Sequence, residues 1–539
     1  MKKIIGAATV LLIAVLSLAY LYFSNLSVKS RSNDRVLSEI PADAAVVFQY
    51  PNDRSLYDIF KDYTVFDTIV GTKNKAELSW LKDFLLNDTE LYTATAGQKI
   101  FLSFHPFTSD SVQFLWSMPL KEGIRPEEFR SMLEKEVKNQ IISSQELGQS
   151  VLQIKNADLD RSFYLCIDRG IARGSFSRSV LIRSIDKNSA KIDPAFIKVI
   201  NAGSREDENA LASLFINYNK PGFLNPFFRL NLNGNFELFQ SFSGYSSLKL
   251  NYKSDALMFN GITETSGASD SYIRLFLNQK PIKNTIKRIM PENTSNSVAY
   301  GLSDYTAYHK DLSNLFEKRK ELDTLKKQLS LLTTETGINP DRDIKKLWGN
   351  ELITLQLSTY EYLAIVKVTN GRSLQFYLDP LSSSYTELVR KMNYANLFYF
   401  YLGDPFKRYF KPFYSITDNL LILSNSPGTV QRFLEAYNQE RFLYKAEAFH
   451  QFDQLVADQA NVSFFLHFNN SGSLLRSLLK RSYSQNFNGN KYGLKDLYAL
   501  SYQLTSNKEH FFTNFYTGYK NTATTTDPLL ISVDSIDNK

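Results

Sequence analysis

Residues 213–224 read SLFINYNKPGFL, and residues 463–474 read SFFLHFNNSGSL. Five of the twelve positions are identical, and three more exchange one apolar or aromatic residue for another. The two copies are offset by 250 residues without a gap. Each copy has an apolar run, a polar turn with a glycine and a second apolar run, which is the pattern of a strand, a turn and a helix. The chain therefore contains the same structural unit twice.

Other strand-like segments recur in the same order at about the same offset. A repeat of this length indicates a duplicated domain, because the units of solenoids and propellers are much shorter. The recurring pairs are 44–50 with 297–302, 99–104 with 351–357, 112–120 with 362–368, 163–168 with 413–418, 248–252 with 499–504, and 256–262 with 510–516.

The recurring segments are mostly short strands joined by hairpin turns, with helical patterns after several of them. They predict an α+β fold of two tandemly duplicated, mostly antiparallel, strand-rich domains with helices. We expect the first domain at residues 39–285, the second at 286–520 and a polar tail at 521–539. One long helix is expected over 310–333, because its leucines lie on one side and its lysines and glutamates on the other.

The composition is typical of a folded, multidomain protein. Of the 539 residues, 43% are apolar and 22% are charged, which excludes a disordered chain. The net charge of +7, from 62 basic and 55 acidic residues, is too small a bias to indicate a nucleic-acid partner. The single cysteine, Cys166, excludes an intramolecular disulfide. Because it lies in an apolar strand, we expect it to be a small buried side chain.

The N-terminus has the pattern of a membrane span. Residues 4–23, IIGAATVLLIAVLSLAYLYF, would form a helix of about 30 Å, long enough to cross a bilayer. A cleaved signal peptide is the alternative, but its apolar region is usually shorter and ends in small residues. We therefore expect a transmembrane signal-anchor helix at 4–23, between a cytoplasmic N-tail at 1–3 and a linker at 24–38.

Basic residues flank this segment on both sides. Lys2 and Lys3 favour a cytoplasmic N-terminus, whereas Lys29, Arg31 and Arg35 favour the opposite orientation. A three-residue tail with two lysines is typical of an export signal. We therefore expect a single-pass membrane protein of the cell envelope. The bulk of the chain would lie outside the cytoplasm, on the periplasmic side of the inner membrane.

Three segments together resemble a family of bacterial proteins. They are IPADA at 40–44, GINPDRDIKKLWGNELITL at 337–355 and ITDNLLILSNSPGTVQRFL at 416–434. The family is membrane-anchored and extracytoplasmic, and its domain has no known function. The resemblance covers most of residues 38–520 as a pattern of strand starts and turns, without a catalytic signature. The first half departs from it, because no Gly-Ile-Asn-Pro segment precedes Lys99. The resemblance implies the topology and no activity.

The sequence contains no local catalytic or metal-binding motif. Glycine-rich phosphate loops, the G-x-S-x-G elbow and the H-E-x-x-H helix are all absent from it. The closest two histidines, His450 and His467, are 17 residues apart, so no local pair predicts a metal site. Ser-x-x-Lys pairs such as Ser477 and Lys480 occur, but no Lys-Thr-Gly accompanies them. We predict no catalytic residue, cofactor or metal.

Four residues are candidates for contacting a partner. Asn219 and Asn469 stand at the same turn of the duplicated unit. Because duplicated domains often bind at their interface, we expect a site between these turns. Lys407 and Arg408 lie in FKRYFKPFY (406–414), where basic and aromatic residues interleave as in surfaces for anionic headgroups, glycans or single strands. An extracytoplasmic location argues against nucleic acid, and an ordinary charged edge is the alternative for this segment.

Three functions fit these observations. The first is a non-catalytic envelope protein that binds or scaffolds another envelope protein. The second is a carrier or accessory protein for a hydrophobic ligand such as lipid, which would need a dry groove between the halves. The third is a hydrolase-type enzyme with a site built from scattered residues, which would need a cleft where titratable groups converge.

Overall fold

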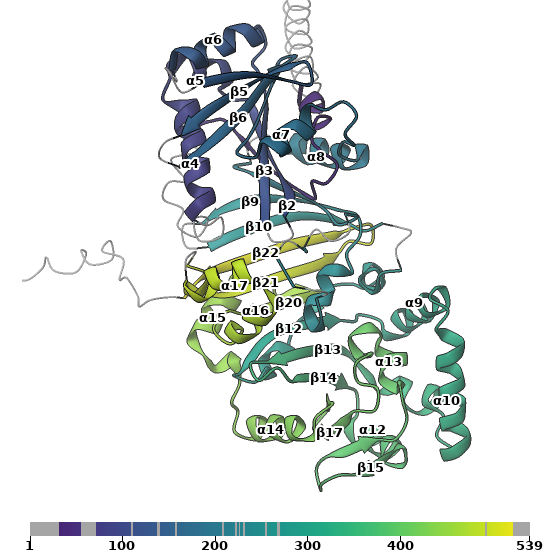
Figure 1. Cartoon of the computed structure of the whole chain (residues 1–539). Coiled ribbons are helices and arrows are strands. Elements are labelled where there is room, and N and C mark those ends of the chain that lie inside the picture. The colour runs from purple at the N-terminus through teal and green to yellow at the C-terminus, as the bar shows by residue number, and fades with distance from the viewer. Residues whose placement is uncertain are drawn as a thin grey trace, which may run out of the picture.

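In the described part of the chain, a single antiparallel sheet of 20 strands runs through the centre of the molecule (Figure 1). The computed structural model describes residues 32–54, 72–108, 111–136, 141–156, 159–206, 210–220, 224–225, 227–229, 232–253, 256–266, 270–490 and 493–520. From one edge to the centre the strands are β4 (Ile141–Glu146), β5 (Gln149–Asn156), β6 (Arg161–Asp168), β7 (Ile171–Ser175), β3 (Ser111–Pro119), β2 (Lys99–Thr108), β1 (Val46–Pro51), β8 (Ser213–Asn217), β9 (Tyr245–Lys253) and β10 (Ala256–Glu264). From the centre to the other edge they are β22 (Phe511–Tyr519), β21 (Leu497–Ser506), β20 (Val462–His467), β12 (Thr294–Gly301), β13 (Trp348–Leu357), β14 (Tyr362–Val368), β18 (Leu420–Ser424), β17 (Phe413–Thr417), β16 (Arg390–Met392) and β15 (Ser382–Ser384).

The second ten strands repeat the order of the first ten in reverse. At the centre β10 pairs with β22, and Asn260 lies opposite Asn514, its counterpart by strand register. The two halves of the sheet are therefore related by a two-fold pseudo-axis through this pair. The predicted α+β class with mostly antiparallel strands is confirmed, and the predicted hairpin of 99–104 with 112–120 is the pair β2 and β3.

Helices cover both faces of the sheet. On the face that we call face A, the helices are α7 (Arg178–Ile185), α8 (Pro194–Glu206), α14 (Pro427–Asn438) and α15 (Glu447–Asp453). On the opposite face B they are α4 (Thr72–Leu86), α5 (Thr89–Thr95), α6 (Pro126–Glu136), α9 (Tyr305–Lys318), α10 (Leu322–Thr336), α11 (Pro340–Asp343), α12 (Gly371–Leu378), α13 (Leu397–Leu402), α16 (Gly472–Leu478) and α17 (Arg481–Asn488). The fold thus has three layers, with apolar cores above and below the sheet.

An aromatic cluster fills the space between the two halves on face B. Phe239, at the end of the short helix η1 (Gly234–Gln240), packs against Phe464 of β20 with ring centroids 5.0 Å apart. Phe242 packs against Tyr502 of β21 at 5.8 Å, and the hydroxyl oxygens of Tyr218 and Tyr502 lie 3.3 Å apart. The two halves therefore share one apolar core on this face.

The prediction of one long helix over 310–333 is wrong. The segment forms two helices, α9 and α10, that are separated at residues 319–321. Lys320 takes a left-handed backbone conformation with φ of +60°, which ends the first helix. The guanidinium of Arg319 pairs with the carboxylate of Asp404 at 2.6 Å and fixes this break. The residue types give no sign of it, since no glycine or proline lies there.

The predicted membrane span at 4–23 and the polar tail at 521–539 lie outside the described residues. Within the described ranges, no helix combines the length and the apolar character needed to cross a bilayer. The predicted domain boundaries stay predictions. The buried position of Cys166 in β6 is confirmed.

Candidate binding groove at the centre of the sheet

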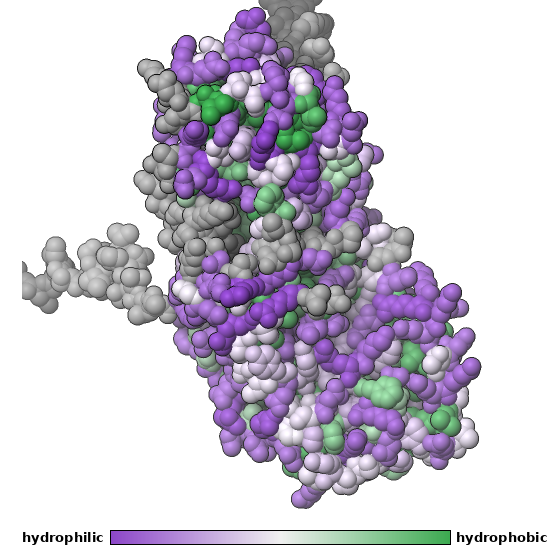
Figure 2. Space-filling model, viewed as in Figure 1, coloured by the Kyte–Doolittle hydropathy of each residue, from purple (hydrophilic) through white to green (hydrophobic). Residues whose placement is uncertain are grey.

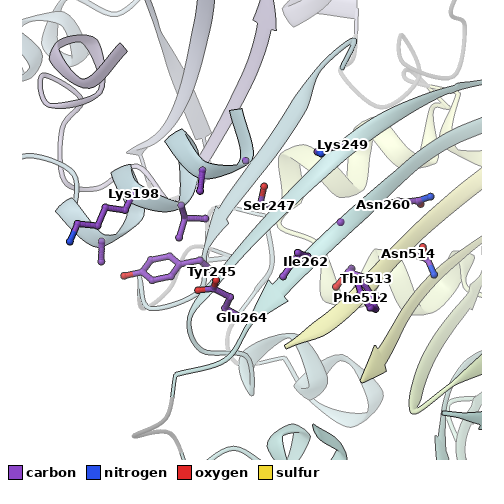
Figure 3. Close-up of a pocket in the computed structure, with 15 residues that line it drawn as sticks. Lys198, Tyr245, Ser247, Lys249, Asn260, Ile262, Glu264, Phe512, Thr513 and Asn514 are labelled. Carbon is purple, nitrogen blue, oxygen red and sulfur yellow. The ribbon is translucent and has the colours of Figure 1, made fainter. Parts of the chain in front are cut away.

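A groove of about 740 Å³ lies on face A beside the pseudo-axis (Figure 3). Helix α8 forms one wall, and strands β9, β10 and β22 form the floor. The side chains that define its chemistry are Lys198 and Ala202 of α8, Tyr245 and Lys249 of β9, Glu264 of β10 and Phe512 of β22.

The floor follows from the alternation of side chains along a strand. Leu257 and Phe259 of β10 point into the core of face B, so Asn260, Ile262 and Glu264 point into the groove. Ile262 and its cross-strand partner Phe512 form an apolar pair at the centre. Phe512 is 48% exposed. On the molecular face drawn in Figure 2, hydrophilic residues predominate and apolar ones occur in separate spots.

The groove is open because α8 turns small residues toward the sheet. A Cβ on Gly203 would come within 2.2 Å of the Ser247 Oγ, so only glycine allows the helix to lie this close to β9. Ala202 beside it is exposed and fills little of the space. The groove is therefore a product of small side chains at one end of α8.

The corresponding place in the second half is filled. There, Phe452 of α15 packs on Tyr516, which by strand register is the counterpart of Ile262 on the groove floor. The Phe452 ring packs against Tyr498 and Tyr516, with centroids 5.7 and 5.2 Å away. The cavity beneath α15 measures only about 30 Å³, the volume of about one water molecule. The groove thus distinguishes the first half from its counterpart.

Opposite charges mark the two ends of the groove. Lys249 of β9 pairs with Asn260, and Tyr245 pairs with Glu264 four residues further along β10. At about 3.4 Å per residue, the two charged positions are about 14 Å apart. The Tyr245 hydroxyl donates a hydrogen bond of 2.8 Å to the carboxylate of Asp193. Burial, and then this carboxylate, raise the pKa of Tyr245, so its phenol stays protonated and acts only as a polar contact.

A Ser–His–Asp arrangement lies elsewhere on face A, and the sequence motifs did not reveal it. The Nδ1 of His105 lies 2.8 Å from the carboxylate of Asp43, and its Nε2 lies 2.8 Å from the Ser103 Oγ. Because a carboxylate only accepts, Nδ1 donates to Asp43 and Nε2 accepts from Ser103. This is the order of contacts in a catalytic triad.

The same residues are inaccessible. Ser103 and His105 both have no exposed surface, so no substrate reaches the hydroxyl. Burial would raise the pKa of Asp43, but hydrogen bonds and charge from His105 and Arg183 outweigh it and lower that pKa to about 2. This network joins the turn before β1 to β2 and α7, and we interpret it as structural.

The four residues predicted to contact a partner are not brought together. Asn219 accepts a hydrogen bond of 2.9 Å from the Gly244 backbone and stabilises a turn, while Asn469 is exposed after β20. Four strands separate β8 from β20, so the two duplicated turns do not face each other across a site. Lys407 pairs with a glutamate, and Arg408 stacks on an aromatic ring. None of the four lines the groove.

Part of the groove was accessible to sequence reasoning. The alternation of Leu257 and Phe259 with Asn260 and Glu264 indicates a strand with one core face and one exposed face. The pairing of β10 with β22 depends on topology, which no local pattern specifies. The small residues of α8 indicate a groove only when α8 is compared with α15, where Phe452 fills the corresponding space.

No protein-family model matches the chain, and searches of curated proteins and of solved structures found no match. In the described ranges, no cluster of three or more histidine, cysteine, aspartate or glutamate side chains is placed to hold a metal ion. The fold and the groove define a class of protein: a pseudo-symmetric α+β protein with a surface groove at its centre.

Proposed function

We propose that this chain is a non-catalytic binding protein of the bacterial cell envelope, anchored by residues 4–23 with residues 39–520 outside the cytoplasm. Its groove on face A would bind another envelope protein. We infer that the halves 39–285 and 286–520 descend from one duplicated domain. The observation that carries the proposal is the groove itself, which is open in the first half while Phe452 fills the corresponding place in the second.

The chemistry of the groove supports binding more than catalysis. Tyr245 is held as a neutral phenol by burial and Asp193, and Lys249 and Glu264 are about 14 Å apart along the strands, too far for one to activate the other. The buried Ser103 and its histidine do not open into this groove. Shape and contact area, rather than proton transfer, are what the groove offers.

A protein partner fits the groove better than a lipid does. A lipid carrier needs an enclosed apolar cavity, because an acyl chain must be removed from water. Here the floor is open, and Asn260 and Glu264 on it are exposed. An open surface with a central apolar pair and a polar rim is the usual composition of a protein interface.

Co-purification with matched variants tests the proposal. Ala202→Phe places an aromatic ring in the groove, where the second half has the ring of Phe452. Ser330→Phe adds the same ring at an exposed position of α10, far from the groove (Figure 1). We expect one envelope protein to co-purify with the wild type and with Ser330→Phe, and to be lost from Ala202→Phe. Equal recovery with all three would reject the groove as the binding site.

A reporter fusion tests the topology separately. Fused after Arg35, a reporter that works only outside the cytoplasm should be active. Activity of a cytoplasm-specific reporter at the same position would overturn the proposed location, whatever the groove binds.

A further inference from the structure

We propose that the groove is the docking site for an amphipathic helix of a partner protein, whose N-terminus lies toward Glu264 and whose C-terminus lies toward Lys249. This inference rests on the proposed binding function and names the element that the groove recognises.

The width of the groove is that of one helix. Phe196 of α8 stacks on Tyr245 of β9 and belongs to the same core cluster as Phe215 of β8. Phe452 of α15 packs on Phe465 of β20 and Tyr498 of β21. The two helices thus rest four strand spacings apart, or about 19 Å. Because packed helices lie about 8–10 Å apart, one further helix fits between them.

The surfaces around this space are apolar where a helix would touch them. Ala195, Val199 and Ala202 recur at helical spacing along the groove side of α8, and all three are exposed or half-buried. Their small size permits close approach of a second helix. Ile262 and Phe512 lie on the floor opposite. Together they match the apolar stripe of an amphipathic helix, with Phe512 as the central anchor.

The charges give the docked helix a direction. A span of about 14 Å between Lys249 and Glu264 corresponds to about nine residues of helix. The partial positive charge at a helix N-terminus is favoured near a carboxylate, and the partial negative charge at its C-terminus is favoured near a lysine. Carboxylates in the last turn of the partner helix would strengthen the same orientation.

An extended segment cannot bind here by adding to the sheet. β10 is hydrogen-bonded to β9 on one side and to β22 on the other, so its backbone groups are already paired. Strand addition needs a free sheet edge. What the groove presents is side chains on a sheet face, the kind of surface on which helices pack throughout this fold.

Site-specific cross-linking of the full-length chain in membranes of the cells that produce it tests this inference. Ala195→Cys and Ala202→Cys would each be labelled with a photoactivatable thiol reagent, and the captured peptides identified by mass spectrometry. The two positions are seven residues, or about 10 Å, apart on α8. The native Cys166 is fully buried, so the unsubstituted chain is the background control, and Ser330→Cys is the surface control.

We expect both variants to capture the same segment of one protein, at residues about seven apart, with the residue captured by Ala195→Cys on the N-terminal side. A separation of about three residues would indicate an extended segment. That separation, or capture in the reversed order, would contradict the proposed docked helix and would leave the proposed binding function intact. Capture of this chain's own peptides would also overturn it, by making a second copy the partner. Lipid alone, or no capture above the Ser330→Cys control, would overturn both the helix and the proposed function.

Discussion

The Oγ1 atoms of Thr263 and Thr513, two residues 250 positions apart in the chain, lie 2.7 Å from each other in a buried hydrogen bond. Their bond joins β10 to β22 and so crosses the joint between the two halves, beside the pseudo-axis. A second bond across the joint runs from Arg229 Nε to the carbonyl of Leu479, its counterpart 250 residues later. Bonds between equivalent residues are typical of a symmetric dimer interface. The joint between the halves therefore has the character of an interface between two copies of one domain.

Replacing one threonine of the pair should lower the free energy of unfolding by more than the loss of one hydrogen bond alone would. The Oγ1 of Thr263 also lies 2.6 Å from the Ser246 Oγ, so Thr263→Val leaves buried hydroxyls without this partner. We expect a loss of about 1–3 kcal/mol in the free energy of unfolding. The double variant with Thr513→Val should lose less than the sum of the two single variants, because the orphaned hydroxyl is removed as well. Urea unfolding of the four proteins measures this, and strictly additive losses would contradict it.

Substitutions at Phe452 and at Ala202 should differ sharply in their effect on the free energy of unfolding. Phe452→Ala empties a packed site and should destabilise the protein by about 3–5 kcal/mol. Ala202→Phe places its ring in an open groove and should change stability by about 0.5 kcal/mol or less. Thermal unfolding of both variants against the wild type checks the contrast. A comparable loss in Ala202→Phe would show that the groove is not open in solution.

Much of the fold could be predicted from the repeated pattern, and the assembly of the two halves could not. Apolar alternation and turn residues located most strands, because those signals are local. The reversal of strand order about Asn260 and Asn514 depends on which edges meet, and edge strands such as β10 look alike whether they pair or stay free. The two duplicated turns were expected to face each other, and four strands lie between them.

The candidate site was missed for a related reason. Sequence reasoning selected residues that carry chemistry, such as Asn219, Asn469, Lys407 and Arg408. The groove instead depends on what is small, chiefly Ala202 and the glycine beside it. A small residue on a helix does not indicate a groove until the element that faces it is known. The comparison of α8 with α15 identifies that element, because the mirrored strand order shows which side chains lie over corresponding strands.

The break between α9 and α10 gives a prediction about backbone strain. Lys320 has φ of +60°, a conformation that costs an L-residue about 1–2 kcal/mol. Lys320→Gly relieves this cost and adds flexibility to the unfolded chain, so we expect a net gain of about 0.5–1 kcal/mol in stability. Lys310→Gly, at an exposed position inside α9, should instead lose about 1 kcal/mol. Denaturant midpoints of the two variants measure the difference, and losses in both would mean that the break is not a fixed feature.

Buried histidines should make the protein less stable in mild acid. Burial lowers the pKa of His309 and of His467 to about 4, and it also lowers that of His105. Below the ordinary histidine pKa of about 6.5, the unfolded chain binds protons that the folded chain does not, so stability falls as the pH drops toward 4. Each such histidine contributes a slope of up to about 1.4 kcal/mol per pH unit in this window.

His467→Asn tests this directly, because asparagine already occupies the equivalent position 217 in the first half. Whatever it does to stability at pH 7, the variant should show a flatter decline of unfolding free energy between pH 6 and pH 4.5. His309→Gln should flatten the decline by a similar amount, and the double variant by the sum of the two. Urea midpoints measured across this range give the slopes. An unchanged slope in His467→Asn would mean that this imidazole binds its proton equally well in the folded and unfolded chain.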